Sequence, residues 1–203
     1  GIRRLDQMLN GGIPTGSAVL VYGPPFLGKE ALARGFFRHS VESGTPGIYV
    51  LTNAASADVR REMAASPAYQ QAEKERLSRF VDTYSRSIGA EDSFKGAEFL
   101  EGALDLNGIT LAVNKVQADI IGDHDAHAFV LDSISTLVAY TNPATAFRFL
   151  QTLIGRPAKW AEDEPFAAPQ ADGRTDAVFG SVFVYLPGTY VPASILKLAT
   201  AQA

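Results

Sequence analysis

The sequence from residue 17 to residue 30 decides the fold. A short apolar run, Ser17-Ala18-Val19-Leu20-Val21-Tyr22, is followed by Gly23-Pro24-Pro25-Phe26-Leu27-Gly28-Lys29-Glu30. The apolar run predicts a buried strand, and apolar residues at helical spacing over residues 29–41 predict a helix directly after the glycine-rich turn. A strand, a glycine-rich loop and a helix in this order form the context in which backbone N–H groups bind phosphate.

The eight residues 23–30 match the phosphate-loop pattern GxxxxGK[ST] at seven positions. In such a loop the backbone cradles the phosphates and the lysine, here Lys29, reaches the β- and γ-oxygens. The eighth position carries Glu30 where a serine or threonine hydroxyl would hold Mg²⁺. We expect this bulkier, negatively charged side chain to weaken binding of the magnesium–nucleotide complex, although it could coordinate the cation itself. A glycine–proline turn with a chance Gly-Lys pair is the structural alternative.

A second motif, Phe129-Val130-Leu131-Asp132-Ser133, is an apolar run that ends in aspartate. In phosphate-loop proteins a carboxylate at the end of such a strand helps to hold Mg²⁺ beside the phosphates. Many strands end in aspartate, so the motif is weak by itself. Downstream of a phosphate loop it predicts Asp132 as the residue near a cation.

The remaining sequence alternates between strand and helix patterns. It predicts an α/β fold of three layers, with a mostly parallel central sheet and helices on both faces. We expect a single domain over residues 1–203, interrupted by an acidic loop insertion at 159–176 and cut at the C-terminus from a longer protein. Strands are predicted at 17–22, 47–52, 79–83, 128–131 and 178–186; helices are predicted at 29–41, 56–63, 68–76, 96–119 (kinked near 107–108), 143–154 and 192–200.

The amino-acid composition excludes several kinds of functional site. The 203 residues carry a net charge of −4 and contain no cysteine, which excludes disulfides, iron–sulfur clusters and thiolate zinc sites. No apolar run approaches the roughly 20 residues that span a bilayer, so we expect a cytoplasmic domain that does not enter membranes. The charge balance does not support nucleic-acid binding. Four arginines that could form a local basic patch are expected instead on solvated helix faces: Arg34, Arg38, Arg60 and Arg61.

The segment Asp123-His124-Asp125-Ala126-His127 contains side chains of the types that bind metals. It directly precedes a predicted strand, where a polar connection is expected, and it lacks cysteines or a distant third histidine. We therefore favour an ordinary polar connection, with a metal site as the alternative.

The motifs together resemble the KaiC-like branch of the RecA superfamily of ATPases, over nearly the whole chain and in the same order. The resemblance implies a RecA-like core that binds ATP or ADP, with Mg²⁺ as a possible companion, and that assembles into homo-oligomers. It also allows a protein partner in signalling. The matching segments are residues 1–9, 11–17, 49–52, 80–85, 131–137, 147–151 and 186–189, besides the phosphate loop.

Two departures from the KaiC-like pattern concern catalysis. Relatives usually carry glutamate after the second strand to orient the attacking water, whereas that position here is Asn53, followed by Ala54. An amide cannot accept the proton that a glutamate base takes. With Glu30 at the magnesium position, this predicts a nucleotide-binding regulatory or scaffold domain with weak or absent hydrolysis. The alternatives are a magnesium-dependent ATPase that uses Glu30 as a cation ligand, and an interaction module that no longer binds nucleotide.

Overall fold

The computed structural model describes residues 3–9, 18–21, 27–90, 93–121, 127–154 and 182–185. The strands in these ranges are β1 (Ala18–Val21), β2 (Gly47–Leu51), β3 (Ser78–Asp82), β4 (Ala97–Phe99), β5 (Ala128–Asp132) and β6 (Val182–Tyr185). The helices are α1 (Arg3–Met8), α2 (Lys29–Glu42), α3 (Ser56–Met63), α4 (Pro67–Lys74), the short 3-10 helix η1 (Arg86–Ile88), α5 (Leu106–Ile121), α6 (Ile134–Tyr140) and α7 (Pro143–Ile154).

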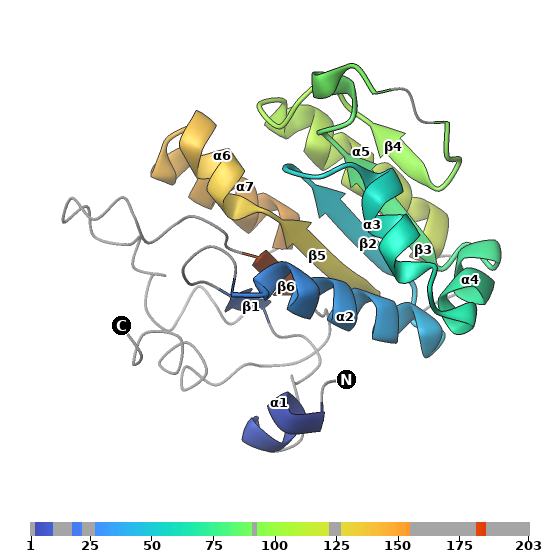
Figure 1. Ribbon diagram of the computed structural model, residues 1–203. Coiled ribbons are helices and arrows are strands. Elements are labelled where there is room, and N and C mark those ends of the chain that lie inside the picture. The colour runs from blue at the N-terminus through green and yellow to red at the C-terminus, as the bar shows by residue number, and fades with distance from the viewer. Residues whose placement is uncertain are drawn as a thin grey trace.

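The strands form one sheet in the order β1-β6-β5-β2-β3-β4 (Figure 1). Strands β5, β2, β3 and β4 are parallel neighbours, whereas β6 is antiparallel to both β5 and β1. Strand β1 therefore runs in the same direction as the parallel strands. The predicted α/β class and mostly parallel RecA-like sheet are confirmed, with β6 as the reversed strand.

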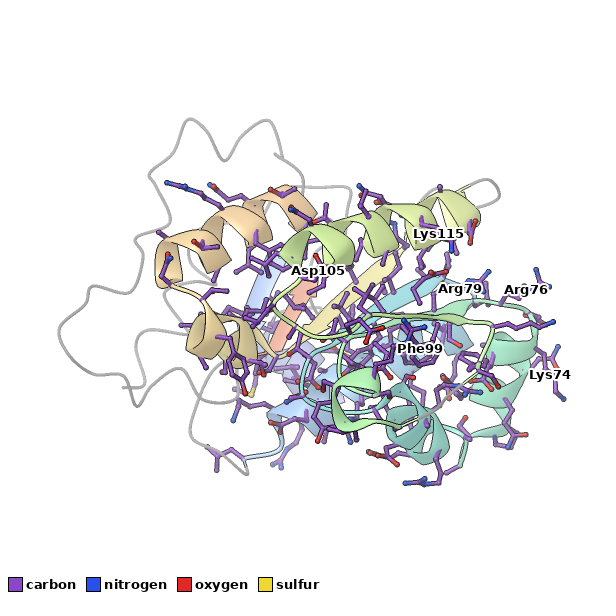
Figure 2. The ribbon with its side chains drawn as sticks, turned by 90° about the horizontal axis from the view of Figure 1, so that it is seen from above. Lys74, Arg76, Arg79, Phe99, Asp105 and Lys115 are labelled. Carbon is purple, nitrogen blue, oxygen red and sulfur yellow. The ribbon has the colours of Figure 1, made fainter. Side chains whose placement is uncertain are left out.

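Side chains of the central strands alternate between two helical layers. In β2, Ile48 and Val50 pack into the core beneath α5, α6 and α7, whereas Tyr49 and Leu51 pack into the core beneath α2, α3 and α4. This alternation follows from the two-residue period of a strand. Seen from above, the sheet lies between these two sets of helices (Figure 2). Both faces are covered, which explains why β2 and β5 are apolar along nearly their whole length.

The predicted long helix at 96–119 is wrong over its first ten residues, 96–105. Residues 97–99 form β4 beside β3, and the helix begins only at Leu106. Asp105 explains the boundary, because its Oδ1 accepts a hydrogen bond of 2.8 Å from the backbone N–H of Gly108. A side-chain acceptor at this position satisfies a backbone donor that the first helical turn leaves unpaired, so the helix starts there.

Helices α1 and α6 were not predicted from the sequence pattern. Helix α6 follows β5 after a single residue, Ser133, whose hydroxyl accepts a hydrogen bond from the N–H of Thr136.

Several predictions concern residues outside the described ranges: the acidic loop at 159–176, the closing helix at 192–200, and the extent of the domain over 1–203. None of the helices in the described ranges combines the length and apolar character that a bilayer crossing requires. The cytoplasmic location stays a prediction.

Candidate functional site

The carboxyl ends of the strands meet along one edge of the sheet. Val21 of β1 and Asp132 of β5 both pair with Val182 of β6, and Asp132 pairs in turn with Leu51 of β2. The end of β1 therefore lies two strands from Asp132, about 10 Å across the sheet. Open α/β sheets bind their ligands at this edge. The predicted phosphate loop leaves β1 at the same edge, although its residues Gly23–Phe26 lie outside the described ranges.

Helix α2 begins where the predicted loop ends. Gly28 precedes it with φ 79° and ψ 20°, a left-handed conformation that favours glycine. No side chain of the described residues caps this helix end, so its first backbone N–H groups and the positive end of the helix dipole suit an anion. Lys29 is the first helical residue and is 5% exposed. The described part of the predicted phosphate site is thus a helix N-terminus preceded by a glycine in the left-handed conformation.

Asp132 is buried at the end of β5, with 1% of its surface exposed. The hydroxyl of Tyr49 donates a hydrogen bond of 3.1 Å to its Oδ2. The ring of Tyr49 is held by Phe37 and Phe80, whose ring centroids lie 5.1 and 6.2 Å from its own. Oδ1 of Asp132 accepts no hydrogen bond from the part of the chain that the structure describes. A buried carboxylate oxygen whose lone pairs accept no hydrogen bond is a suitable ligand for a hard cation such as Mg²⁺.

The negative charge of Glu30 acts on Asp132. Burial raises the pKa of the Asp132 carboxyl, and the charge of Glu30 raises this pKa further, while the hydrogen bond from Tyr49 lowers it. Glu30 lies in the first turn of α2 and is partly buried. The two carboxylates that the sequence connects with a cation therefore influence each other electrostatically. Both offer oxygen ligands, but the hydroxyl of the usual phosphate loop is missing.

Asn53 lies just after β2 and, like Glu30, affects the carboxylate of Asp132. A reciprocal pair of hydrogen bonds fixes the end of β2: Oγ1 of Thr52 donates to the Ser133 carbonyl (2.9 Å) and accepts from the Ser133 N–H (2.7 Å). The side chain of Asn53 lies close enough to Asp132 to lower its pKa. An amide side chain thus lies beside Asp132 at the end of β2.

The sequence of the chain matches the profile of a known family. The family profile described as "ATPase: KaiC" matches residues 1–160. The chain belongs to the KaiC ATPase family. This membership supports a nucleotide-binding domain of the RecA superfamily, as the phosphate loop predicted.

Curated relatives of this KaiC-family chain include UPF0273 proteins of several organisms. The chain is 34% identical to that of Pyrococcus furiosus over 149 residues, which cover 72% of this chain and 57% of the relative. It is 33% identical to that of Methanopyrus kandleri over 122 residues, covering 58% and 48%, and 29% identical to that of Thermotoga maritima over 147 residues, covering 72% and 58%. The chain therefore spans about half the length of the curated relatives it matches.

Asp82 supports the backbone beside Asn53, and the sequence analysis included it only as part of the resemblance. It lies at the end of β3, in register with Leu51, and is fully buried. Its carboxylate accepts hydrogen bonds from the N–H of Ser56 (2.7 Å), from the N–H groups of Tyr84 and Ser85 (2.9 and 2.8 Å), and from the Ser85 hydroxyl (2.7 Å). Ser56 is the first residue of α3, so Asp82 anchors the loop that carries Asn53.

We expect Asp82→Asn to lower the free energy of unfolding by about 1.5–3 kcal/mol, since its carboxylate binds four donors. Burial alone would raise the pKa of Asp82, but the hydrogen bonds outweigh it and lower this pKa below its ordinary value. The stabilisation is therefore complete above about pH 4, the unfolded value, and disappears as the pH falls through the lower folded pKa.

Urea unfolding of both proteins at several pH values measures this difference. The control is Asp58→Asn, which removes an exposed carboxylate paired with Arg61 and should cost no more than about 0.5 kcal/mol. If the two variants lose equal stability at neutral pH, Asp82 does not hold the loop.

The four arginines expected on solvated helix faces differ in environment. Arg38 and Arg61 are exposed, as predicted, and each pairs with a carboxylate on its own helix. Arg34 and Arg60 are partly buried, which corrects the prediction for these two. Nε of Arg60 donates to Glu73 (2.8 Å) and its guanidinium lies over the ring of Phe94, whereas Arg34 pairs with Glu62 of α3. Since each of the four has a carboxylate partner, they do not form a basic patch.

His127 is the described member of the predicted metal-ligand segment, whose other residues, 123–126, lie outside the described ranges. It is buried at the start of β5, and burial lowers the pKa of its imidazole. Within the part of the chain that the structure describes, no three histidine, aspartate or glutamate side chains converge in a way that suits a metal ion.

Proposed function

We propose that this KaiC-family domain binds ATP or ADP at the N-terminus of α2 and hydrolyses ATP weakly or not at all, acting as a regulatory or scaffold domain. The observation that carries the proposal is the amide of Asn53 beside Asp132. Membership of the family supports a nucleotide site, and Asn53 cannot act as the general base that hydrolysis needs.

The binding roles follow from position and charge. The loop Gly23–Gly28 and the first N–H groups of α2 would hold the phosphates, with Lys29 supplying a positive charge. Asp132 and Glu30 are the residues that would face Mg²⁺, which when bound offsets the negative charge of the phosphates. Asn53 can orient a water molecule through its amide, but it cannot take a proton from it. General-base catalysis contributes about 10²–10⁴-fold to enzyme rates, so its loss leaves at most slow turnover.

A second candidate is a magnesium-dependent ATPase in which Glu30 replaces the missing hydroxyl as cation ligand. Two observations favour this alternative: Glu30 lies in the first turn of α2, the helix that packs on β5, and its charge raises the pKa of Asp132. Titration with a fluorescent ATP analogue, with magnesium and with EDTA, combined with a phosphate-release assay, separates the candidates. Binding without turnover supports our proposal, and tight magnesium-dependent binding with turnover supports the ATPase. Absence of binding under both conditions would support the remaining alternative, an interaction module that no longer binds nucleotide.

We expect Lys29→Ala to weaken binding of the ATP analogue by several-fold or more, because it removes a charge-assisted contact to phosphate. The affinity is measured by fluorescence titration. Lys74→Ala is the control, since Lys74 is exposed at the end of α4 and should not affect binding (Figure 2). Equal affinities of the wild type and Lys29→Ala would show that the loop no longer holds phosphate.

We also propose that the domain forms a homo-oligomer and contacts a protein partner in signalling, as the family resemblance implies. Light scattering with and without nucleotide should detect species larger than a monomer. A monomer at high protein concentration under both conditions would count against self-association.

A further inference from the structure

Four basic side chains gather at the amino end of strands β3 and β4, the end of the sheet opposite to the nucleotide edge. They form the basic cluster of Lys74, Arg76, Arg79 and Lys95. Lys74 ends α4, Arg76 lies in the turn that follows, and Arg79 is the second residue of β3. Strand β4 pairs in register with β3, so Lys95, two residues before β4, lies beside the start of β3. Figure 2 shows Lys74, Arg76 and Arg79 on one side of the molecule.

The basic cluster is not neutralised by ion pairs. None of its four side chains pairs with a carboxylate of the residues that the structure describes. The exposed arginines of α2, α3 and η1 differ, because each has a carboxylate partner: Arg38, Arg61 and Arg86. Lack of a partner is therefore a property of this cluster and not of exposed arginines in general.

Carboxylates that are close to the cluster along the chain bind other groups. Glu73 pairs with Arg60 (2.8 Å), and Glu98 pairs with Lys115 (2.8 Å). Glu75 accepts a hydrogen bond of 2.6 Å from a side-chain amide of α4. Within the described ranges, the cluster thus carries a positive charge that the fold does not neutralise.

Arg79 is the partly buried member of the cluster. Its Nε is buried and has no hydrogen-bond partner among the described residues. A buried donor without an acceptor costs free energy, so this atom indicates that an acceptor from outside the described residues completes its bonding. Carboxylate oxygens are the acceptors that a guanidinium binds most strongly.

Arg76 occupies a backbone position that favours glycine. Its φ of 62° lies in the left-handed region, and it directly follows the C-terminal cap of α4. The N–H of Leu77 donates to the Ala72 carbonyl (2.9 Å) and the N–H of Arg76 to the Glu73 carbonyl (3.0 Å), the bonds of a Schellman helix end. Glycine fits this position without strain, so an arginine here is better explained by what its side chain binds than by the fold.

The surroundings of the cluster favour a peptide over a nucleic acid. The chain has a net charge of −4, and Glu75 lies between two of the cluster's cations in the sequence. A nucleic-acid backbone carries evenly spaced charges over a long surface, so it would also meet such carboxylates. An extended peptide can place its own carboxylates at the cations alone, where arginine can bind them through two parallel hydrogen bonds.

We propose that the basic cluster binds an acidic, extended segment of a partner protein. The inference rests on the part of the proposed function that concerns a protein partner, and it does not depend on nucleotide binding. Arg79 and Asp82 are three residues apart in β3, about 10 Å, so the cluster and the nucleotide edge are separate surfaces.

The test measures fluorescence anisotropy with a labelled short peptide of alternating glutamate and glycine, and with the same peptide carrying glutamine instead. The wild type should bind only the glutamate peptide, and added salt should weaken this binding. Arg76→Gln combined with Lys95→Gln should lose about tenfold in affinity, the scale of one to two charge-assisted contacts. The matched control is Arg4→Gln with Arg148→Gln, which removes the same charge from exposed arginines of α1 and α7 and should bind as the wild type.

Arg76→Gly separates a binding role from a structural one. Because glycine suits the left-handed backbone, the urea midpoint of unfolding should stay equal or rise, while the affinity for the glutamate peptide should fall several-fold. An unchanged affinity would contradict the role of Arg76.

Three further outcomes would overturn the proposal: no binding of the glutamate peptide, an equal loss in the control variant, or tighter binding of a duplex oligonucleotide or of phosphatidylserine vesicles. Titration of the same proteins with the fluorescent ATP analogue keeps the two proposals apart. Nucleotide binding without peptide binding would overturn this inference alone, and peptide binding without nucleotide binding would overturn the nucleotide site alone.

Discussion

Glu30→Thr combined with Asn53→Glu should raise the rate of ATP hydrolysis by about 10²-fold or more over the wild type. Threonine at position 30 restores the hydroxyl that holds Mg²⁺ and removes a negative charge beside Asp132. Glutamate at position 53 places a carboxylate at the end of β2, where the Thr52–Ser133 hydrogen bonds fix the backbone. The rate is measured by phosphate release over a range of protein concentrations, because a basic side chain supplied by a neighbouring subunit would act only in an oligomer.

The matched control is Glu30→Thr with Asn53→Gln, which has a side chain of the same length without a carboxylate. This control should bind the magnesium–ATP complex more tightly than the wild type and still hydrolyse it slowly. Equal rates for the two double variants would show that position 53 does not act as a base. An unchanged magnesium–ATP affinity in Glu30→Thr alone would show that Glu30 does not face the cation.

Phe37→Ala should lower the free energy of unfolding by about 3–5 kcal/mol, the usual cost of deleting a buried aromatic ring. Phe37 is fully buried in α2 and lies against Tyr49 and Phe80, with ring centroids 5.1 and 5.7 Å away. Since the Tyr49 hydroxyl donates to Asp132, the cavity should also loosen the site. Chemical denaturation followed by circular dichroism measures the loss.

Phe36→Ala is the control for Phe37→Ala, since Phe36 is the preceding residue of the same helix and is only partly buried. It removes the same atoms and should cost clearly less. An equal loss in both variants would mean that the cluster around Tyr49 is no better packed than the helix surface.

The sequence predicts the elements whose patterns are local. Strands β2 and β5 are nearly continuous apolar runs, and their boundaries agree with the structure to within one residue. Asn53 and Asp132 were found because each follows or ends such a run. The structure then places them together because β2 and β5 are neighbours in parallel register.

The features that the sequence did not predict depend on contacts between distant residues. Tyr49 and Asp132 are 83 residues apart, and Asp82 meets Ser56 across 26 residues. Arg34 resembles any charged residue on an amphipathic helix, and only the fold shows that it is partly buried and pairs with Glu62 of α3. Strand β4 was missed because three residues are too few to establish a period, and its pairing with β3 defines it instead.

The most direct test of the central claim measures ATP binding and ATP hydrolysis in the same sample of the wild-type protein. Radiolabelled ATP is incubated with the protein at concentrations above the dissociation constant, with magnesium and with EDTA, and bound nucleotide and released phosphate are counted together. We predict saturable binding with turnover far below 1 per second. Hydrolysis on the order of 1 per second or faster, near the low end of typical enzyme turnover, would contradict our interpretation of Glu30 and Asn53. Absence of binding under both conditions would contradict the nucleotide site itself.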